Sequence, residues 1–274
     1  MTKILCPVDL QGASLNALNY AASFCRQTAS TLTIYHAITE TVITENRDDL
    51  LPDEVVEKKE AAEATIDKIC RETRDNFNIA CNYVIENANL ADGISSISKN
   101  DEYGLIIMGT KGANKLSKFV IGSNTVNVIE QIDCPILAVP AEYYNTEISN
   151  IVYATNYQKG DDESITELLG FANMLGAKLT ILHVSQSGNP AKLEIFKTYQ
   201  DYVYEEFYYD LDVKLEQVVY ENVEKGILDY MEKNNGDILA MLTKHRGLLE
   251  QITHDSLTRK MALLAEYPIL VFHK

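Results

Sequence analysis

Short apolar runs alternate with helical periods along the chain. In the first half, the apolar runs predict buried strands at 4–8, 31–38, 79–85, 105–108 and 135–139. Between them, apolar residues recur at helical spacing, which predicts helices over 14–27, 53–74, 90–99 and 122–132. The runs do not alternate apolar with polar residues, which is typical of strands covered on both faces. Strands that alternate with helices predict βαβ units and a parallel sheet.

The second half repeats this order of runs in the same register. IVYAT at 151–155 corresponds to ILCPV, and His183 follows His36 by 147 residues. The later runs DILAMLT and EYPILVF follow their counterparts by 133 residues, because the first half has extra residues around ETVITENRDDLLP. This pattern predicts a tandem duplication with domains at 1–143 and 149–274. No long linker separates the copies, so we expect an intramolecular pseudo-dimer, and homo-oligomers are a further expectation.

The length, hydrophobic content and net charge of the chain exclude several classes of function. At 274 residues and 46% hydrophobic content, the chain suits two globular domains. No apolar run approaches the roughly 20 residues of a membrane helix, and Asp9 interrupts the first run too early for a signal peptide. The net charge of −16 disfavours nucleic acid and anionic membranes as partners. We therefore expect a soluble cytoplasmic protein.

The five cysteines do not form a recognisable framework. Their number is odd and no CxxC occurs, which argues against disulfides and zinc. Cys6, Cys81 and Cys134 lie in or beside apolar runs, so we expect buried thiols. A redox sensor is the less favoured alternative.

One segment contrasts with the acidic chain. From Tyr103 to Ile129 there is no acid but three lysines. Within it, GTKGANKLSKFVIGSNT places glycines directly after a buried run and at the start of a helix. Glycines let a backbone approach a ligand closely, and a helix N-terminus favours a phosphate. The spacing matches neither the phosphate loop nor the dinucleotide fingerprint. The residues alone leave a phosphate site and an ordinary capped turn open.

This pattern, G-x2-G-x9-G-[ST], resembles the universal stress protein family, as do PVD, which ends the first strand, and a His-small pair, which ends the second. The resemblance spans the first half and, more weakly, the second. It implies two tandem α/β domains, each with an open, twisted, parallel sheet of five strands and helices on both faces. That fold is Rossmann-like, of the adenine-nucleotide alpha-hydrolase type. The implied ligand is ATP, with AMP and ADP as alternatives and Mg²⁺ as a companion ion.

The resemblance also implies site residues. Asp9 would lie near the ribose and Mg²⁺, as the single metal ligand, and the backbones of Val8 and Ala37 would border the adenine, with Met108 beside it. The phosphates would be surrounded by Gly109, Gly112, Gly122, Ser123 and Thr125, the last two adding hydroxyl donors. The chain departs from the family pattern at Ala88, which implies a tighter adenine pocket, and at Leu10-Gln11.

The second copy lacks these features. Leu242 stands at the position of Gly109, His245 at Gly112, Asp255 at Gly122 and Asn156 at Asp9. A carboxylate at the helix N-terminus occupies the anion position itself. We therefore expect nucleotide binding in the first half only.

Other groups of residues give weaker indications of a functional site. His36 and His183 suit backbone hydrogen bonds better than a shared metal, and a Tyr-rich segment at 196–211 suits an oligomer or domain contact. No nucleophile–base set is recognisable, so we expect a nucleotide-responsive protein of the stress response without dedicated catalysis. A nucleotide-free interaction module and a slow ATPase or self-phosphorylating protein are the alternatives.

Overall fold

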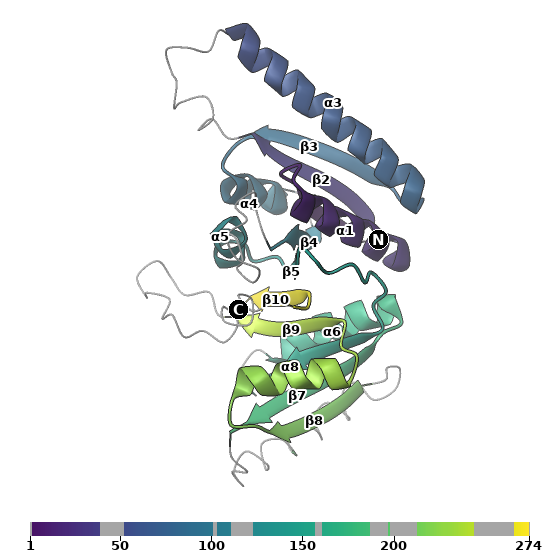
Figure 1. Ribbon diagram of the computed structural model, residues 1–274, viewed down its shortest axis with the longest axis vertical. Coiled ribbons are helices and arrows are strands. Elements are labelled where there is room, and N and C mark those ends of the chain that lie inside the picture. Colours follow the sequence, from purple (N-terminus) through teal and green to yellow (C-terminus); the bar gives the residue numbers. More distant parts are fainter. Residues whose placement is uncertain are drawn as a thin grey trace. The chain divides into compact units, whose positions relative to one another are not determined.

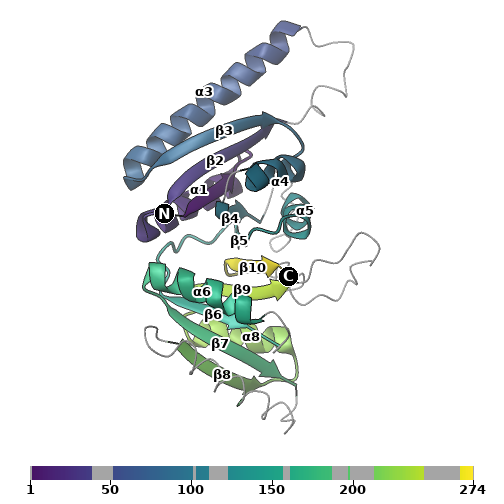
Figure 2. The same ribbon diagram turned by 180° about the vertical axis from the view of Figure 1, so that it is seen from behind.

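The structure, a computed structural model, describes residues 2–38, 52–100, 103–110, 123–156, 161–186, 197, 213–243 and 266–273. They belong to two compact units, Met1–Thr146 and Glu147–Lys274. Each unit is an α/β unit in its own right (Figures 1 and 2). Among these residues, no helix is both long and apolar enough to cross a membrane. The Tyr-rich segment lies outside the described residues, except for Lys197.

The first unit alternates strands and helices. Its elements are β1 (Lys3–Pro7), α1 (Gly12–Thr28), β2 (Thr31–Ile38), α3 (Pro52–Phe77), β3 (Cys81–Asn87), α4 (Leu90–Asn100), β4 (Tyr103–Gly109), α5 (Ser123–Gln131) and β5 (Ile136–Val139). The strands pair in parallel in the order β3-β2-β1-β4-β5. Every predicted strand and helix of this half is therefore present.

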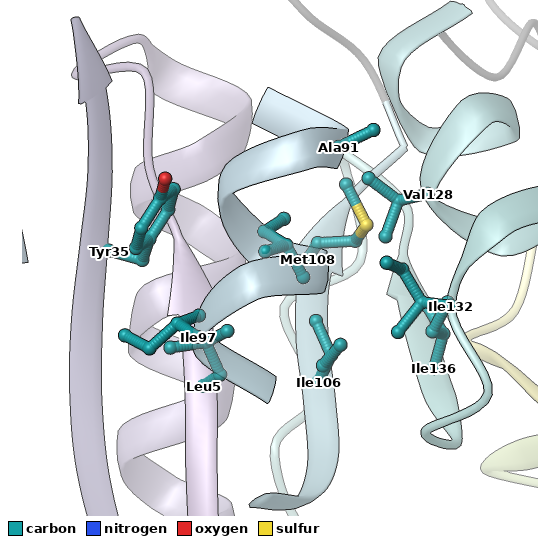
Figure 3. Close-up of a cluster of buried hydrophobic side chains, with 10 residues drawn as sticks. Leu5, Tyr35, Ala91, Ile97, Ile106, Met108, Val128, Ile132 and Ile136 are labelled. Carbon is teal, nitrogen blue, oxygen red and sulfur yellow. The ribbon is translucent and has the colours of Figure 1, made fainter. Parts of the chain in front are cut away.

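Helices cover both faces of this sheet. α4 and α5 pack over an apolar cluster that includes Leu5, Ile106, Met108, Val128 and Ile136 (Figure 3). α1 contacts β1, β2 and β4, while α3 contacts β2, β3 and α1. This double cover explains why β1, β4 and β5 are mostly apolar.

The second unit has the same relative strand order. Its elements are β6 (Asn150–Ala154), α6 (Asp161–Leu175), β7 (Lys178–Ser185), β8 (Val213–Val219), α8 (Val223–Lys233), β9 (Ile238–Thr243) and β10 (Ile269–His273). They pair in parallel as β10-β9-β6-β7-β8. Within the described residues, the predicted α/β fold with five parallel strands per unit is confirmed.

Backbone contacts also recur at the two sequence offsets. Val8 N donates to Tyr35 O at 2.8 Å, and Thr155 N donates to Leu182 O at 2.9 Å, 147 residues later. Ile106 N donates to Pro135 O at 2.9 Å. The bond that follows it by 133 residues, Leu239 N to Pro268 O, also measures 2.9 Å. The strand registers repeat in the same way, as Ile4 pairs with Leu32 and Ile151 with Leu179. The two halves thus fold with the same local pairing.

All five cysteines are free thiols. Four of them are buried, and Cys134 is half-buried. The expectation of buried thiols is confirmed for Cys6 and Cys81, and Cys134 is more exposed than expected.

Candidate functional site

The first sheet has a topological switch point between β1 and β4. β1 is followed in sequence by β2 on one side, whereas β4 and β5 lie on the other side. In open parallel sheets, ligands bind outside the carboxyl ends of the strands at such a point. Val8 and Asp9 follow β1 here, Gly109 ends β4 and Ala37 is the penultimate residue of β2. Four of the predicted site residues therefore share one edge of one sheet.

A tight turn after β1 holds the carboxylate of Asp9. Its Oδ1 accepts hydrogen bonds from Gln11 N at 2.9 Å and from Ser14 Oγ at 2.6 Å. Leu10 adopts a φ of 61° within this turn, a conformation that is costly for a bulky residue. Asp9 is exposed, and its second oxygen has no hydrogen bond among the described residues. One oxygen fixes the turn and the other remains available to a ligand.

Gly109 lies against the first turn of α1. A Cβ at this position would stand 2.9 Å from the carbonyl oxygen of Ala13 and 3.4 Å from Ser14 N. Its φ is outside the left-handed region. Close packing between β4 and α1, and not backbone freedom, is what requires glycine here. The sequence predicts that Gly109 lets a ligand approach, and it gives no indication of this packing against α1.

Thr125 ties the start of α5 to the end of β4. Its Oγ1 donates a hydrogen bond to Gly109 O at 2.9 Å, and the residue is 2% exposed. The hydroxyl proton is therefore committed to the backbone and is not a free donor for a phosphate. α5 begins at Ser123. Gly112 and Gly122, together with the side chain of Ser123, lie outside the described residues, so their roles stay predictions.

The adenine side of the predicted site is more closely packed. Met108 is 4% exposed, and its side chain lies in the apolar cluster beside Val128 and Ala91 (Figure 3). Ala37 is half-buried and packs against the same cluster. Val8 engages both its backbone groups with β2, because its N–H donates to Tyr35 O and its carbonyl accepts from His36. These residues form a floor with few free polar groups.

A buried phenol and a carboxylate adjoin this floor, and sequence reasoning missed them. Tyr35 is fully buried and donates to Glu86 Oε2 at 3.0 Å. Glu86 pairs in register with Ala37 on the neighbouring strand. Burial, followed by the hydrogen bond and charge of Glu86, raises the pKa of Tyr35 well above its usual range. A Cβ at Gly93 would collide with the Tyr35 hydroxyl. Tyr35 lies within a predicted strand, but Glu86 follows the predicted run 79–85, so the sequence gives no signal that the two residues meet.

The two strand-end histidines make equivalent backbone contacts. His36 Nδ1 donates to Val8 O at 2.8 Å, and His183 Nδ1 donates to Thr155 O at 2.9 Å. The expectation of a structural histidine bound to backbone is confirmed. No group of three or more candidate metal ligands exists among the residues that the structure describes.

The second unit has different side chains at the matching edge. Leu242 replaces Gly109 and is 8% exposed, and Asn156 replaces Asp9. Gly226 stands where Gly93 is in the first half. A Cβ on it would meet Val184 Cγ1 at 2.7 Å and the Tyr220 side chain at 3.0 Å. Apolar and aromatic groups thus fill this edge of the second unit. His245, Asp255, Ser256 and Thr258 lie outside the described residues.

Residues 1–140 match the Universal stress protein family, and the chain therefore belongs to this family. No curated protein sequence matches it. A universal stress protein from Archaeoglobus fulgidus DSM 4304 has a similar structure, with a TM-score of 0.80 and 19% identity over 99% of this chain and 98% of that one. A functionally unknown protein from Pseudomonas aeruginosa PAO1 follows, with a TM-score of 0.66 and 15% identity over 100% and 92%. These similarities show that the fold extends over both halves.

Proposed function

We propose that this chain is a cytoplasmic ATP-binding universal stress protein whose first half alone holds the nucleotide. Bound ATP would change how the protein meets a partner, through the segment that follows β4. The second half would be a diverged copy that serves packing or partner contact. The assignment is to binding and regulation, not to dedicated catalysis.

The hydrogen bond between Thr125 and Gly109 carries this proposal. It fixes the first turn of α5 beside the end of β4, at the switch point of the sheet. The first N–H groups of a helix lack intrahelical partners and lie at the positive end of its dipole. α5 has no acidic residue in its first turn that would compete for that end. A phosphate chain placed there would meet backbone donors and no carboxylate from α5.

The N-terminus of a second helix also lies at this edge of the sheet. α1 begins after Gln11, whose side chain makes no capping hydrogen bond. The absence of a Cβ at Gly109 lets the start of α1 lie against the end of β4. Two helix N-termini thus approach the β1–β4 edge. The Asp9 carboxylate already lies at the start of α1, so the start of α5 is the terminus left for a phosphate.

The remaining parts of ATP can be matched to the described residues. The half-buried Ala37 and the floor around Met108 offer an apolar surface for a purine. Asp9 has one free carboxylate oxygen for a ribose hydroxyl or for Mg²⁺. Mg²⁺ is usually held by one or two carboxylates together with phosphate oxygens and water. A single aspartate therefore fits a metal that arrives with the nucleotide, and this metal would screen charge on the phosphates.

The second half supports the contrast. Its edge has Leu242, Val184 and Tyr220 where the first half has small residues, and Asn156 instead of Asp9. The recurrence of backbone bonds at fixed offsets supports descent from a duplicated ancestor. We infer that the copy retained its scaffold and lost the nucleotide site.

Thermal unfolding with and without millimolar ATP and Mg²⁺ tests the proposal. Wild-type protein should be stabilised, because a ligand that binds only the native state raises the melting temperature. Gly122→Asp, which copies the second half, should abolish the shift. Gly170→Asp is the matched control, since it adds the same charge on α6 where a Cβ meets no atom within 4 Å. That variant should respond to ATP as the wild type does.

The rival functions give different results. No thermal shift in wild type would favour a nucleotide-free interaction module of the same fold. A shift accompanied by phosphate release that disappears in Asp9→Ala would favour a slow ATPase. An unchanged shift in Gly122→Asp would contradict the assignment of phosphates to the start of α5.

A further inference from the structure

Two thiols from different elements meet under the long helix α3. Cys70 on α3 and Cys81 at the start of β3 have their Sγ atoms 3.5 Å apart. Both residues are buried and neither is in a disulfide. The Cys70 thiol also lies 3.4 Å from the Cys81 carbonyl oxygen. A displacement of about 1.5 Å would bring the sulfurs to the length of a disulfide bond.

Arg74 adds a cation to this pair. It lies one turn after Cys70 on α3, and its Nη2 donates to Cys81 O at 2.7 Å. The same nitrogen is 3.9 Å from Cys70 Sγ. The guanidinium therefore fastens α3 to the first residue of β3 and lies beside the Cys70 sulfur. Figure 1 shows α3 lying along β3 in the first unit.

We propose that Cys70 and Cys81 are an oxidisable dithiol, which a two-electron oxidant such as a peroxide converts to a disulfide that clamps α3 to β3. One sulfur attacks the peroxide, the O–O bond breaks, and a sulfenic acid forms. The second sulfur then displaces the sulfenic oxygen and forms the S–S bond. Two thiols and one hydrogen peroxide give one disulfide and two waters, so two electrons pass from sulfur to oxygen.

Burial sets the rate of this reaction. Burial is the main reason that the pKa of Cys81 lies well above its usual value, with neighbouring Cys70 adding to the rise and Arg74 opposing it. The Cys81 thiol therefore stays protonated at neutral pH, and α3 must move to admit an oxidant. The device would therefore respond to sustained oxidation and not to a brief pulse.

The pair is independent of the nucleotide proposal. Cys81 is the first residue of β3, whereas Asp9 and Gly109 lie at the carboxyl ends of their strands. In a parallel sheet these are opposite edges. The closed loop spans only residues 70–81 of the first unit.

Peptide mapping tests the proposal on the full chain. Reduced protein is treated with excess diamide, an azo compound that takes up two electrons and two protons, and is then alkylated in denaturant and digested with trypsin. We expect peptide 69–71 joined to peptide 75–99, and three of the five cysteines alkylated. The melting temperature of the first unit should rise by several degrees, because the cross-link restricts its unfolded chain.

Serine variants provide the controls. Cys70→Ser should give no cross-link and no rise in melting temperature, while Cys25→Ser, which removes another buried thiol, should retain both. Alkylation of all five cysteines after diamide, or a cross-link to a different cysteine, would overturn the proposal. An oxidised protein that has the expected cross-link but an unchanged melting temperature would contradict the claim that the disulfide clamps α3 to β3.

Discussion

The first half of the chain brings backbone segments close together at the carboxyl edge of its sheet, and the second half has larger side chains at the corresponding positions. Gly109 allows the Ala13 carbonyl to approach within 2.9 Å of the position of a Cβ, whereas Leu242 at the matching place is a buried apolar side chain. The scaffold behind the two edges is the same, because His36 and His183 bind equivalent backbone carbonyls. Fold and ligand site are thus specified by different residues.

If the proposed function holds, this contrast illustrates how a site is lost while its fold remains. The strands pair through backbone groups and are held by apolar cover on both faces, and neither depends on the residues at the carboxyl edge. Under the proposal, substitution there would remove a ligand site without disturbing the strands. Leu242, which is 8% exposed at the position that matches Gly109, is an example of a larger side chain packed at this edge.

The largest expected effect comes from exchanging the residues that differ most between the edges. Gly109→Leu would place a side chain against the backbone of α1, which cannot yield easily, and should lower the free energy of unfolding of the first half by about 3 kcal/mol. Leu242→Gly would leave a cavity in the second half and should cost about 3 kcal/mol there. Urea denaturation measures both values. A neutral result for either variant would mean that the edges are not packed as described.

Removal of a polar contact found only in the first half should have the next largest effect. Tyr35→Phe deletes the donor to Glu86 and should lower the stability of the first half by about 2 kcal/mol at pH 7. Leu182 occupies the equivalent place in the second half and has no hydroxyl to lose. Urea denaturation of the variant against wild type measures the loss.

Alkaline pH sharpens this second prediction. The folded-state pKa of Tyr35 is raised above its unfolded value of about 10. Its contribution to stability is therefore complete below pH 10 and declines as pH rises toward the folded-state value. Wild-type protein should lose more stability between pH 10 and pH 11.5 than Tyr35→Phe does. Parallel pH profiles would show that the phenol does not resist ionisation.

The charge difference at the turn after the first strand should have a moderate effect. Asp9→Asn keeps an oxygen that can accept from Gln11 N and Ser14 Oγ, so the turn should persist. Loss of the charge should weaken binding of Mg²⁺-ATP about tenfold, or about 1.4 kcal/mol, and leave metal-free ATP binding nearly unchanged. The reverse substitution Asn156→Asp should create no binding. Equal loss with and without Mg²⁺ would remove the metal role of Asp9.

The smallest effect should be the same in both halves. His36→Leu and His183→Leu each delete one hydrogen bond to a strand carbonyl, at 2.8 and 2.9 Å. Each should lower the stability of its own half by about 1 kcal/mol. Denaturation curves of the two variants test the shared scaffold directly. If the two variants lose stability by amounts that differ by much more than about 1 kcal/mol, the two histidines have different roles.

Much of the fold could be predicted because it follows local patterns. The second strand is predicted at 31–38 and is observed there, because its β-branched and aromatic residues favour a strand. The third was predicted at 79–85 and is observed at Cys81–Asn87. Its end is set by pairing with β2, which holds Glu86 and Asn87 in register despite their polarity. Strand ends depend on the neighbour and not on the segment alone.

The site was less predictable because its contacts join distant segments. Tyr35 and Glu86 are 51 residues apart, and nothing in either run signals the other. Gly109 was assigned to ligand approach, while its contact with Ala13 depends on how α1 crosses the sheet. Thr125 was expected to donate to a phosphate and instead binds Gly109 O. A motif indicates where a functional site lies but does not assign each of its hydrogen bonds.

Isothermal titration calorimetry of the intact chain with ATP and Mg²⁺ tests the central claim most directly, because it counts sites. Loss of the site in the second half predicts one nucleotide per chain, and it predicts none in Gly122→Asp. Two nucleotides per wild-type chain, or a single site that survives in Gly122→Asp, would contradict the difference between the halves on which this account depends.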